Sequence, residues 1–294
     1  MTKFSPQLRF ALLGAISLAI WWRPLTTTLV LAVNDDQYTH IFLIVPISIA
    51  LIVLERRSVY SAPETNIPLG SALFLLATLI GCVGRIGAER LLPDVGLSLN
   101  MAALVTWWIA AFVFCFGSRV ARRLVFPLCF LYWLVPIPET ILSGVVTGLQ
   151  RSSAWTAREL FTAAGVPITQ KGVLLYIPQL TIEVAKECSS IRSTLMLVVT
   201  SMVLAHLFLR SMSRKILVVL VAIPLSIARK GFRIFALSML GMHVDPGFLF
   251  GSLHHKGGIV FFVLALAALL LLLWLLRWTE EQQSLAPASH LTGT

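Results

Sequence analysis

Long apolar runs constrain the fold of this chain more than any other feature of its sequence. A helix that crosses a bilayer needs about 20 mainly apolar residues, with a range of roughly 17–25. The chain offers about eight such runs, several of them short and the first interrupted by Arg23-Pro24. They lie near 8–33, 41–54, 67–84, 98–117, 120–136, 188–209, 215–228 and 257–276. The pattern predicts an all-α polytopic membrane protein with about eight transmembrane helices.

The scarcity of charge supports this fold class. Apolar residues make up 57% of the chain and charged residues 12%, against about 45–50% and about 25% in a soluble domain. These proportions exclude a soluble globular enzyme and a disordered chain. The net charge of +10 comes from Lys and Arg scattered in small groups between the apolar runs. Such a distribution is typical of membrane topology rather than of nucleic-acid binding, so no nucleic-acid partner is expected.

The basic residues predict that both termini lie in the cytoplasm. The two alternating sets of connecting segments hold equal numbers of Lys and Arg, but one set concentrates them in short loops at the ends of the spans. Short loops carry the most weight in orientation. This orientation puts 137–187 and 229–256 on the outer face. We expect residues 1–277 to form a single transmembrane domain and 278–294 to form a polar cytoplasmic tail.

The longest stretch between spans, 137–187, has a pattern of its own. Apolar positions recur at helical spacing over 140–164, between polar and basic ones, which predicts a helix lying in the membrane interface. Residues 171–178 and 180–184 are rich in β-branched side chains and roughly alternating, which predicts a small surface hairpin. The hairpin would deliver the chain to Cys188.

Cys188 stands apart from the other three cysteines. Cys82, Cys115 and Cys129 lie in or beside apolar runs, where a free cysteine is usually a small buried hydrophobe. Cys188 stands in the block Lys-Glu-Cys-Ser-Ser-Ile-Arg-Ser, directly before an apolar run. A helix that starts there would favour a thiolate through its N-terminus and through Arg192, four residues on. A helix N-cap of serines with an incidental cysteine would give the same residues.

A basic cluster follows the run at 215–228. Arg229, Lys230 and Arg233 fall within five residues of one another. We expect Arg229 or Lys230 to extend to lipid headgroups. Arg233 lies between a phenylalanine and an isoleucine, and its fork of donors suits a carbonyl oxygen or a carboxylate. A plain connecting loop is the alternative.

Two adjacent histidines, His254 and His255, precede the last span. A histidine can act as a general base near neutral pH, although a structural role is the alternative. No Cys or His pair has the spacing of a zinc site, so no metal is predicted. Cys, Arg and His at three boundaries on one membrane face suggest a cysteine nucleophile, a base and a cationic group that stabilises a carbonyl.

These blocks resemble motifs of the exosortase/archaeosortase family of multi-span membrane cysteine transpeptidases. The family block Cys-Ser-Gly-Ile-Arg-Ser is similar to 188–193, and Asn-x-x-Arg-Ile is similar to 230–234. His-x-x-x-Gly-x-x-x-Phe matches His254, Gly258 and Phe262, which selects His254 over His255. Two departures are Ser190 in place of Gly and Lys230 in place of Asn. Two upstream stretches are also similar, Asp-Gln-Tyr-Thr-His at 36–40 and Val-Pro-Ile-Pro at 135–138.

The resemblance implies the roles of the site residues. Cys188 would be the nucleophile, His254 the general base and acid, and Arg233 the stabiliser of the oxyanion, with Arg192 and Ser189 in support. The implied activity cleaves a C-terminal sorting signal, of PEP-CTERM type in bacteria, from exported proteins. It then transfers the new carboxyl end to a membrane or surface acceptor.

The resemblance also implies the setting of the reaction. The sorting signal consists of a short motif, a transmembrane helix and a basic tail, and the active site would face outward from the bacterial cytoplasmic (inner) membrane. Membrane lipid and the unidentified acceptor are the other expected partners, and no cofactor is required.

Two alternatives follow from the same residues. A lipid-pathway membrane transferase would use Arg233 and His254 without needing Cys188. A non-enzymatic transporter or assembly scaffold would need none of the three. Substitution at Cys188 separates the first alternative from the peptidase, and substitution at Arg233 or His254 separates the second.

Overall fold

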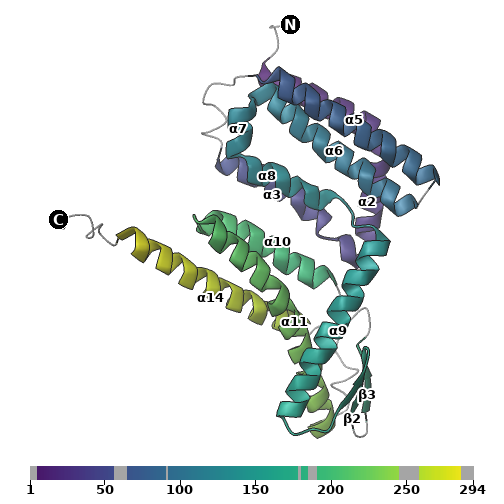
Figure 1. Cartoon of the computed structure of the whole chain (residues 1–294), viewed down its shortest axis with the longest axis vertical. Helices are drawn as coiled ribbons and strands as arrows, with labels where there is room; N and C mark the ends of the chain where they lie inside the picture. Colours follow the sequence, from purple (N-terminus) through teal and green to yellow (C-terminus); the bar gives the residue numbers. More distant parts are fainter. Residues whose placement is uncertain are drawn as a thin grey trace, which may run out of the picture. The chain divides into compact units, whose positions relative to one another are not determined.

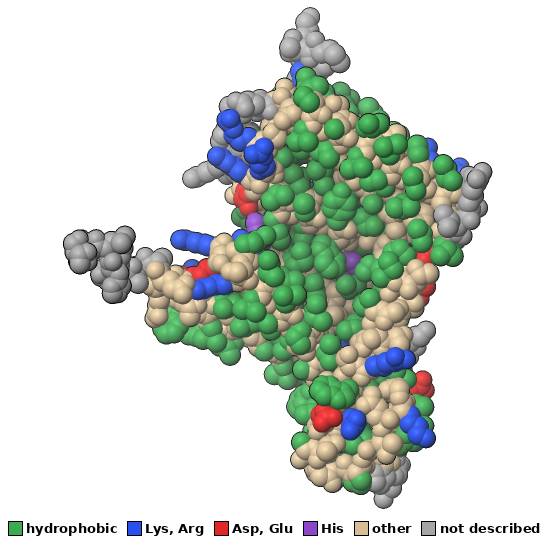
Figure 2. Space-filling model, in the orientation of Figure 1, with side chains coloured by type: hydrophobic (Ala, Val, Ile, Leu, Met, Phe, Trp, Pro, Cys, Tyr) green, Lys and Arg blue, Asp and Glu red, His purple; other side chains and the backbone are tan. Residues whose placement is uncertain are grey.

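Helices form most of the chain, as its apolar runs predict (Figure 1). The computed structural model describes residues 5–55, 65–90, 92–177, 180–184, 191–244 and 258–285. The chain divides into two units, Met1–Leu142 and Ser143–Thr294. On the face shown in Figure 2, hydrophobic side chains cover much of the surface of the helices. An apolar exterior of this kind suits helices that contact lipid.

The first unit is built around two long antiparallel helices, α5 and α6, that lie side by side (Figure 1). A Cβ atom on Gly70 would lie 2.8 Å from Cβ of Phe114, and one on Gly84 would lie 2.8 Å from Nδ2 of Asn100. Glycine therefore lets the two helices approach closely, as at many interfaces between membrane helices. The helices of this unit are α1 (Pro6–Ile20), α2 (Trp22–Asn34), η1 (Asp36–Tyr38), α3 (Ile41–Leu54), α5 (Ile67–Arg90), α6 (Pro93–Phe116), α7 (Ser118–Arg123), α8 (Val125–Phe130) and η2 (Leu131–Leu134).

Pro24 explains why the first apolar run breaks into two helices. Proline has no N–H to donate to the carbonyl of Ile20, so α1 ends there and α2 starts anew with Pro24 in its first turn. The axes of α1 and α2 meet at 76°. The carbonyl of Ile20 instead accepts a hydrogen bond of 3.5 Å from Nη2 of Arg85 on α5. An arginine of a neighbouring helix thus replaces the donor that proline lacks.

The two upstream stretches that resemble family motifs contact each other. The hydroxyl of Tyr38 donates to the carbonyl of Ile137, 3.0 Å away. His40 is only 4% exposed, and its ring meets that of Trp133 edge to face. Glu139, two residues after Ile137, is the first residue of α9. Its backbone N–H donates a hydrogen bond of 2.9 Å to the carboxylate of Asp94. These contacts fix the start of α9.

The second unit contains three helices, α10 (Ile191–Phe208), α11 (Met212–His243) and α14 (Gly258–Leu285), that pack together (Figure 1). Their shared core consists of small and branched apolar side chains, which allow close packing. The buried members are Leu197, Ala205, Leu209, Val218, Ala222, Ala265 and Leu269.

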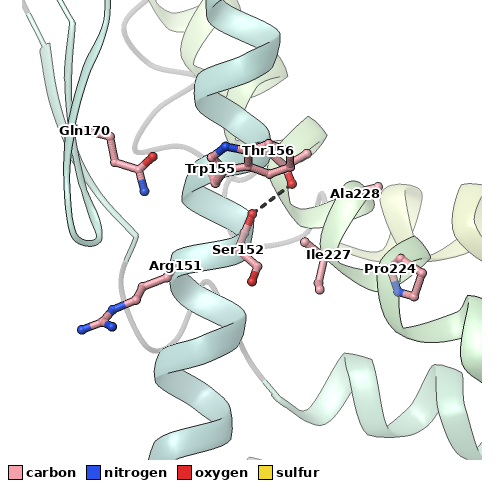
Figure 3. A pocket seen from close by; sticks show the side chains of 8 residues that line it. All are labelled: Arg151, Ser152, Trp155, Thr156, Gln170, Pro224, Ile227 and Ala228. Atoms are coloured by element: carbon pink, nitrogen blue, oxygen red, sulfur yellow. Dashed lines mark hydrogen bonds between the residues drawn. The ribbon is translucent and has the colours of Figure 1, made fainter.

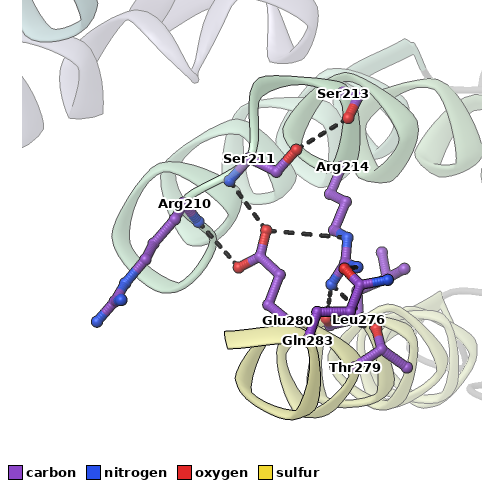
Figure 4. A network of polar contacts seen from close by, with 8 residues as sticks. All are labelled: Arg210, Ser211, Ser213, Arg214, Leu276, Thr279, Glu280 and Gln283. Atoms are coloured by element: carbon purple, nitrogen blue, oxygen red, sulfur yellow. Dashed lines mark hydrogen bonds and ion pairs between the residues drawn. The ribbon is translucent and has the colours of Figure 1, made fainter. Parts of the chain in front are cut away.

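A polar network ties one end of this bundle together (Figure 4). Glu280 on α14 accepts hydrogen bonds from the backbone N–H groups of Arg210 and Ser211, between α10 and α11, at 3.1 and 2.9 Å. Arg214 on α11 donates to the carbonyl of Leu276 at 2.6 Å and to Gln283 at 2.7 Å. The helix of the last span thus continues to Leu285, into the segment expected to be a polar tail, and carries contacts there.

The remaining elements of the second unit are α9 (Glu139–Ala163), except for its first turn, and a small antiparallel sheet. Strands β2 (Leu174–Ile177) and β3 (Leu180–Glu183) form the predicted hairpin, and α9 is the helix predicted over 140–164. A third strand, β1 (Thr169–Lys171), was not predicted; it pairs with β2. The sheet packs on α9 through buried apolar side chains, namely Ala154, Ala157, Leu175 and Val184.

Five described helical segments are long and apolar enough to cross a membrane, and the number rises to seven if each of two bent pairs is one span. The five are Asp36–Leu54, Ile67–Gly87, Pro93–Phe116, Ile191–Phe208 and Gly258–Gln283. The expected count of eight is therefore not confirmed. The predicted span 215–228 lies in α11, where Arg214 and Lys215 at one end and Arg229 and Lys230 at the other crowd the apolar stretch with charge.

The burial expected of the membrane cysteines is only partly correct. Cys115 is buried, whereas Cys82 and Cys129 are exposed on their helices. In a bilayer, an apolar side chain can face lipid instead of the protein interior. An apolar sequence environment consequently does not predict burial against other helices.

Gly231→Ala is expected to destabilise the second unit by about 1–3 kcal/mol, because α9 and α11 meet at this glycine. A Cβ atom there would lie 2.5 Å from Cβ of Thr156 and 3.1 Å from the backbone nitrogen of Ala157. Thermal unfolding of the purified protein measures the change. Adding Thr156→Gly should restore part of the loss, since it removes the nearer atom.

Gly148→Ala on α9 is the matched control, because no atom lies within 4 Å of a Cβ added there. It should leave the stability unchanged or raise it slightly, since alanine favours a helix over glycine. Equal losses for Gly231→Ala and Gly148→Ala would show that the close approach at Gly231 is not the cause.

Candidate active site

The structure describes part of the predicted site. Arg233 lies on α11, and Arg192 lies in the first turn of α10; both are half-buried. Cys188, Ser189 and His254 lie outside the described residues. The described segments that precede and follow these three residues show how the surroundings of the site are arranged.

Arg229 joins α11 to both other helices of the bundle. Its Nη2 donates a hydrogen bond of 2.5 Å to the hydroxyl of Ser193 on α10. Its guanidinium also lies over the ring of Phe262 on α14, 5.7 Å from the ring centroid. Ser193 ends the Cys block and Phe262 ends the His block, so one arginine holds together the elements that follow Cys188 and His254.

Arg233 lies beside the start of the same helix, α14. A Cβ atom on Gly258, the first residue of that helix, would lie 3.5 Å from Nη1 of Arg233. The guanidinium thus packs against backbone that carries no side chain, four residues after His254. The helix geometry explains the pairing, because Arg229 and Arg233 are spaced i, i+4 and share one face of α11.

A buried polar contact supports this arrangement one turn away. The hydroxyls of Thr194 and Ser226 lie 2.7 Å apart between α10 and α11, and both side chains are buried. Lys230 is also buried, at 4% exposed. The expectation that Lys230 reaches lipid headgroups is wrong, because its position on α11 turns it into the protein, and Arg229 is engaged by Ser193 and Phe262.

Gln150 fixes the chain on the other side of Cys188. Its side-chain amide donates a hydrogen bond of 3.0 Å to the carbonyl of Val184, and the amide is buried. The backbone N–H of Val184 donates in turn to the carbonyl of Val173, also at 3.0 Å. Val184 comes four residues before Cys188, so α9 and the sheet anchor the segment that leads to the cysteine.

Two of these residues were missed from the sequence. The sequence leaves Arg229 as one of two candidates for lipid headgroups, although its i, i+4 spacing to Arg233 places both on one helix face. Gln150 belongs to the polar residues interleaved between the apolar positions of 140–164, so the pattern gives no sign of its buried hydrogen bond. Both act on the chain beside the predicted nucleophile and base.

The chemistry available here is that of a cationic, partly buried site. Arg229 and Arg233 bring two guanidinium groups to one face of α11. Positive charge of this kind lowers the cost of a thiolate and of an oxyanion. Among the described residues, no group of three or more His, Cys, Asp or Glu could hold a metal ion.

Replacing Arg229 by alanine is expected to lower the activity of the site by about tenfold, the effect of losing one charge-assisted hydrogen bond. Arg229→Lys should recover part of it, because lysine keeps the charge but not the fork that reaches Ser193. The measurement is the initial rate of substrate processing at equal amounts of folded protein. Arg277→Ala, at an exposed arginine of α14 paired with Glu281, is the control and should have no effect. Full activity of Arg229→Ala would contradict a positioning role.

Gly258→Leu is expected to reduce the activity strongly, whereas Gly258→Ala should be tolerated. The Cβ of alanine would make ordinary van der Waals contact with Arg233 at 3.5 Å, but leucine adds three more carbon atoms and would displace the guanidinium. The same processing rate measures both variants. Equal rates for alanine and leucine would mean that the space beside Arg233 is not needed.

Comparison with known protein families identifies a match over most of the chain. A family model described as a transmembrane exosortase matches residues 21–271 of the 294. Searches of curated proteins and of solved structures find no match. The matched range covers most of the chain and includes all three polar blocks, so the chain belongs to the transmembrane exosortase family.

Proposed function

We propose that this protein is a membrane-embedded cysteine transpeptidase that cleaves C-terminal sorting signals from exported proteins. Family membership supports a transpeptidase-like role in the membrane. The observation that carries the specific proposal is the meeting of the three polar blocks. Arg229 contacts Ser193 and Phe262, and Arg233 lies beside Gly258. A reaction that needs a cysteine, an arginine and a histidine together explains why three distant segments converge here.

The first half-reaction forms a thioester. His254 takes the proton of the Cys188 thiol, and Sγ attacks the carbonyl carbon of the scissile peptide. The carbonyl oxygen becomes an oxyanion, which Arg233 stabilises by charge and hydrogen bonding. As the C–N bond breaks, His254 returns its proton to the leaving amine, and the acyl group stays on Cys188.

The second half-reaction releases the product. A nucleophilic amine or hydroxyl of the acceptor attacks the thioester carbon while His254 accepts its proton. The C–S bond breaks, and the proton returns to the sulfur of Cys188. Arg192 and Ser189 support the thiolate, and Arg229 keeps the Cys and His segments in place through Ser193 and Phe262.

The substrate is an exported protein with a short motif, a transmembrane helix and a basic tail, of PEP-CTERM type. Its helix would lie in the bilayer beside the apolar helices of the enzyme, and its scissile bond would meet Cys188 at the outer face of the bacterial inner membrane. Both termini of the enzyme would then lie in the cytoplasm. The acceptor is a group at the membrane or the cell surface.

Co-expression with a tagged substrate tests this function. The substrate carries the motif, helix and basic tail, and a matched version lacks only the motif. We expect the first to lose its helix and tail, as an intact-mass decrease, and the second to stay whole. Processing of both versions, or of neither, would contradict recognition of a C-terminal sorting signal.

A further inference from the structure

A groove of about 740 Å³ lies on the second unit between α9, β1 and α11 (Figure 3). Ala228, the residue before Arg229, is one of its lining residues. The proposed peptidase chemistry does not use it. Its two sides differ in character, which indicates what it can hold.

The polar residues that line the groove include one cation, Arg151. Arg151 on α9 and Gln170 on β1 both line the groove, and Ser152 and Thr156 on α9 add hydroxyl groups (Figure 3). None of the eight lining residues is acidic. A guanidinium beside neutral hydrogen-bonding groups favours an anion with several acceptor oxygens, such as a phosphate.

The apolar side of the groove continues along α11. Pro224, Ile227 and Ala228 form the wall (Figure 3). Leu217 and Leu220, at 44% and 58% exposed, extend the same helical face away from the groove, at spacings of three and four residues. An exposed apolar stripe on a membrane protein contacts hydrocarbon chains.

Trp155 on α9 also lines the groove. Its side chain is 57% exposed although tryptophan is the largest apolar residue. Tryptophan is enriched where the headgroups of a bilayer meet its apolar core. This position matches the level at which a lipid changes from headgroup to chain.

We propose that this groove binds an anionic phospholipid, with the phosphate at Arg151 and Gln170 and an acyl chain along Pro224, Ile227 and Leu220. Arg151 and the lack of acidic residues among those that line the groove favour a negatively charged headgroup. The apolar stripe selects a chain-bearing ligand over a soluble anion. Lipid would bind there independently of any cleavage reaction.

Quenching of Trp155 by brominated lipids tests this site in the full-length protein. The protein is placed in phosphatidylcholine nanodiscs with increasing fractions of brominated phosphatidylglycerol or, separately, brominated phosphatidylcholine. The Trp155 signal is the difference between the wild type and Trp155→Phe. We expect the anionic lipid to quench it at about tenfold lower mole fraction than phosphatidylcholine.

The charge dependence has a matched control on the same helix. Arg151→Gln should remove the roughly tenfold preference, and Arg151→Lys should keep most of it. Arg158→Gln changes an exposed arginine of α9 that does not line the groove and should leave the preference intact. Equal quenching by both lipids, or an unchanged preference in Arg151→Gln, would overturn the proposal. Displacement of the lipid by inorganic phosphate at similar concentration would also overturn it, because the apolar wall would then contribute nothing.

Discussion

Cys188→Ala is expected to abolish processing of the sorting signal, with a loss of about 10⁴-fold or more in rate. The proposed reaction passes through a bond to Sγ, and no other group can form the thioester. Cys188→Ser should be almost as inactive, because a hydroxyl is a far weaker nucleophile than a thiolate at neutral pH. The measurement is the fraction of co-expressed substrate that keeps its C-terminal tail, at matched levels of membrane-inserted enzyme.

Cys129→Ser is the matched control, since Cys129 is an exposed free cysteine on α8 in the first unit. It should process the substrate like the wild type. Retained activity in Cys188→Ala would exclude the cysteine mechanism and favour the lipid-pathway transferase, which needs Arg233 and His254 but no thiol.

Arg233→Ala is expected to lower the rate by about 10²–10³-fold, the usual effect of removing one oxyanion donor. The loss should fall on the rate at saturating substrate rather than on substrate affinity, because the oxyanion exists only in the reaction. Arg233→Lys should recover only part of the rate, since lysine cannot present two parallel donors. Single-turnover processing by enzyme in detergent separates rate from affinity.

Arg158→Ala controls for the removal of an arginine without affecting the bundle of α10, α11 and α14, because Arg158 is exposed on α9. The transporter or scaffold alternative makes the opposite prediction for Arg233→Ala, namely that function is largely retained. A loss in Arg233→Ala that appears only as lower protein abundance would likewise contradict a role in the reaction.

The helical framework could be predicted from the sequence because the bilayer demands it. A spanning segment must satisfy its own backbone and cover it with apolar side chains, so length and hydropathy suffice to find α5, α6, α10 and α14. The interruption of the first apolar run at Pro24 could also be predicted. The donation from Arg85 to the carbonyl of Ile20 was not, because it depends on how α5 packs against α1.

The candidate site was predictable as a set of residues but not as a set of contacts. Spacing places Arg229 and Arg233 on one face of α11, yet only packing brings Ser193, Gly258 and Phe262 to that face. The burial of Lys230 likewise follows from the rotation of α11 within its bundle. Gln150 is separated by 34 residues from its acceptor, Val184, a pairing that no local pattern specifies.

An acyl adduct on Cys188 is the most direct test of the proposed chemistry. The full-length enzyme is co-expressed with a substrate that carries the sorting signal, quenched with acid, digested and analysed by mass spectrometry. We expect the peptide that contains Cys188 to carry the substrate's new C-terminal residues as a hydroxylamine-sensitive thioester, and the adduct to be absent in Cys188→Ala. Processed substrate without any adduct on Cys188, or an adduct on another residue, would contradict the cysteine transpeptidase mechanism.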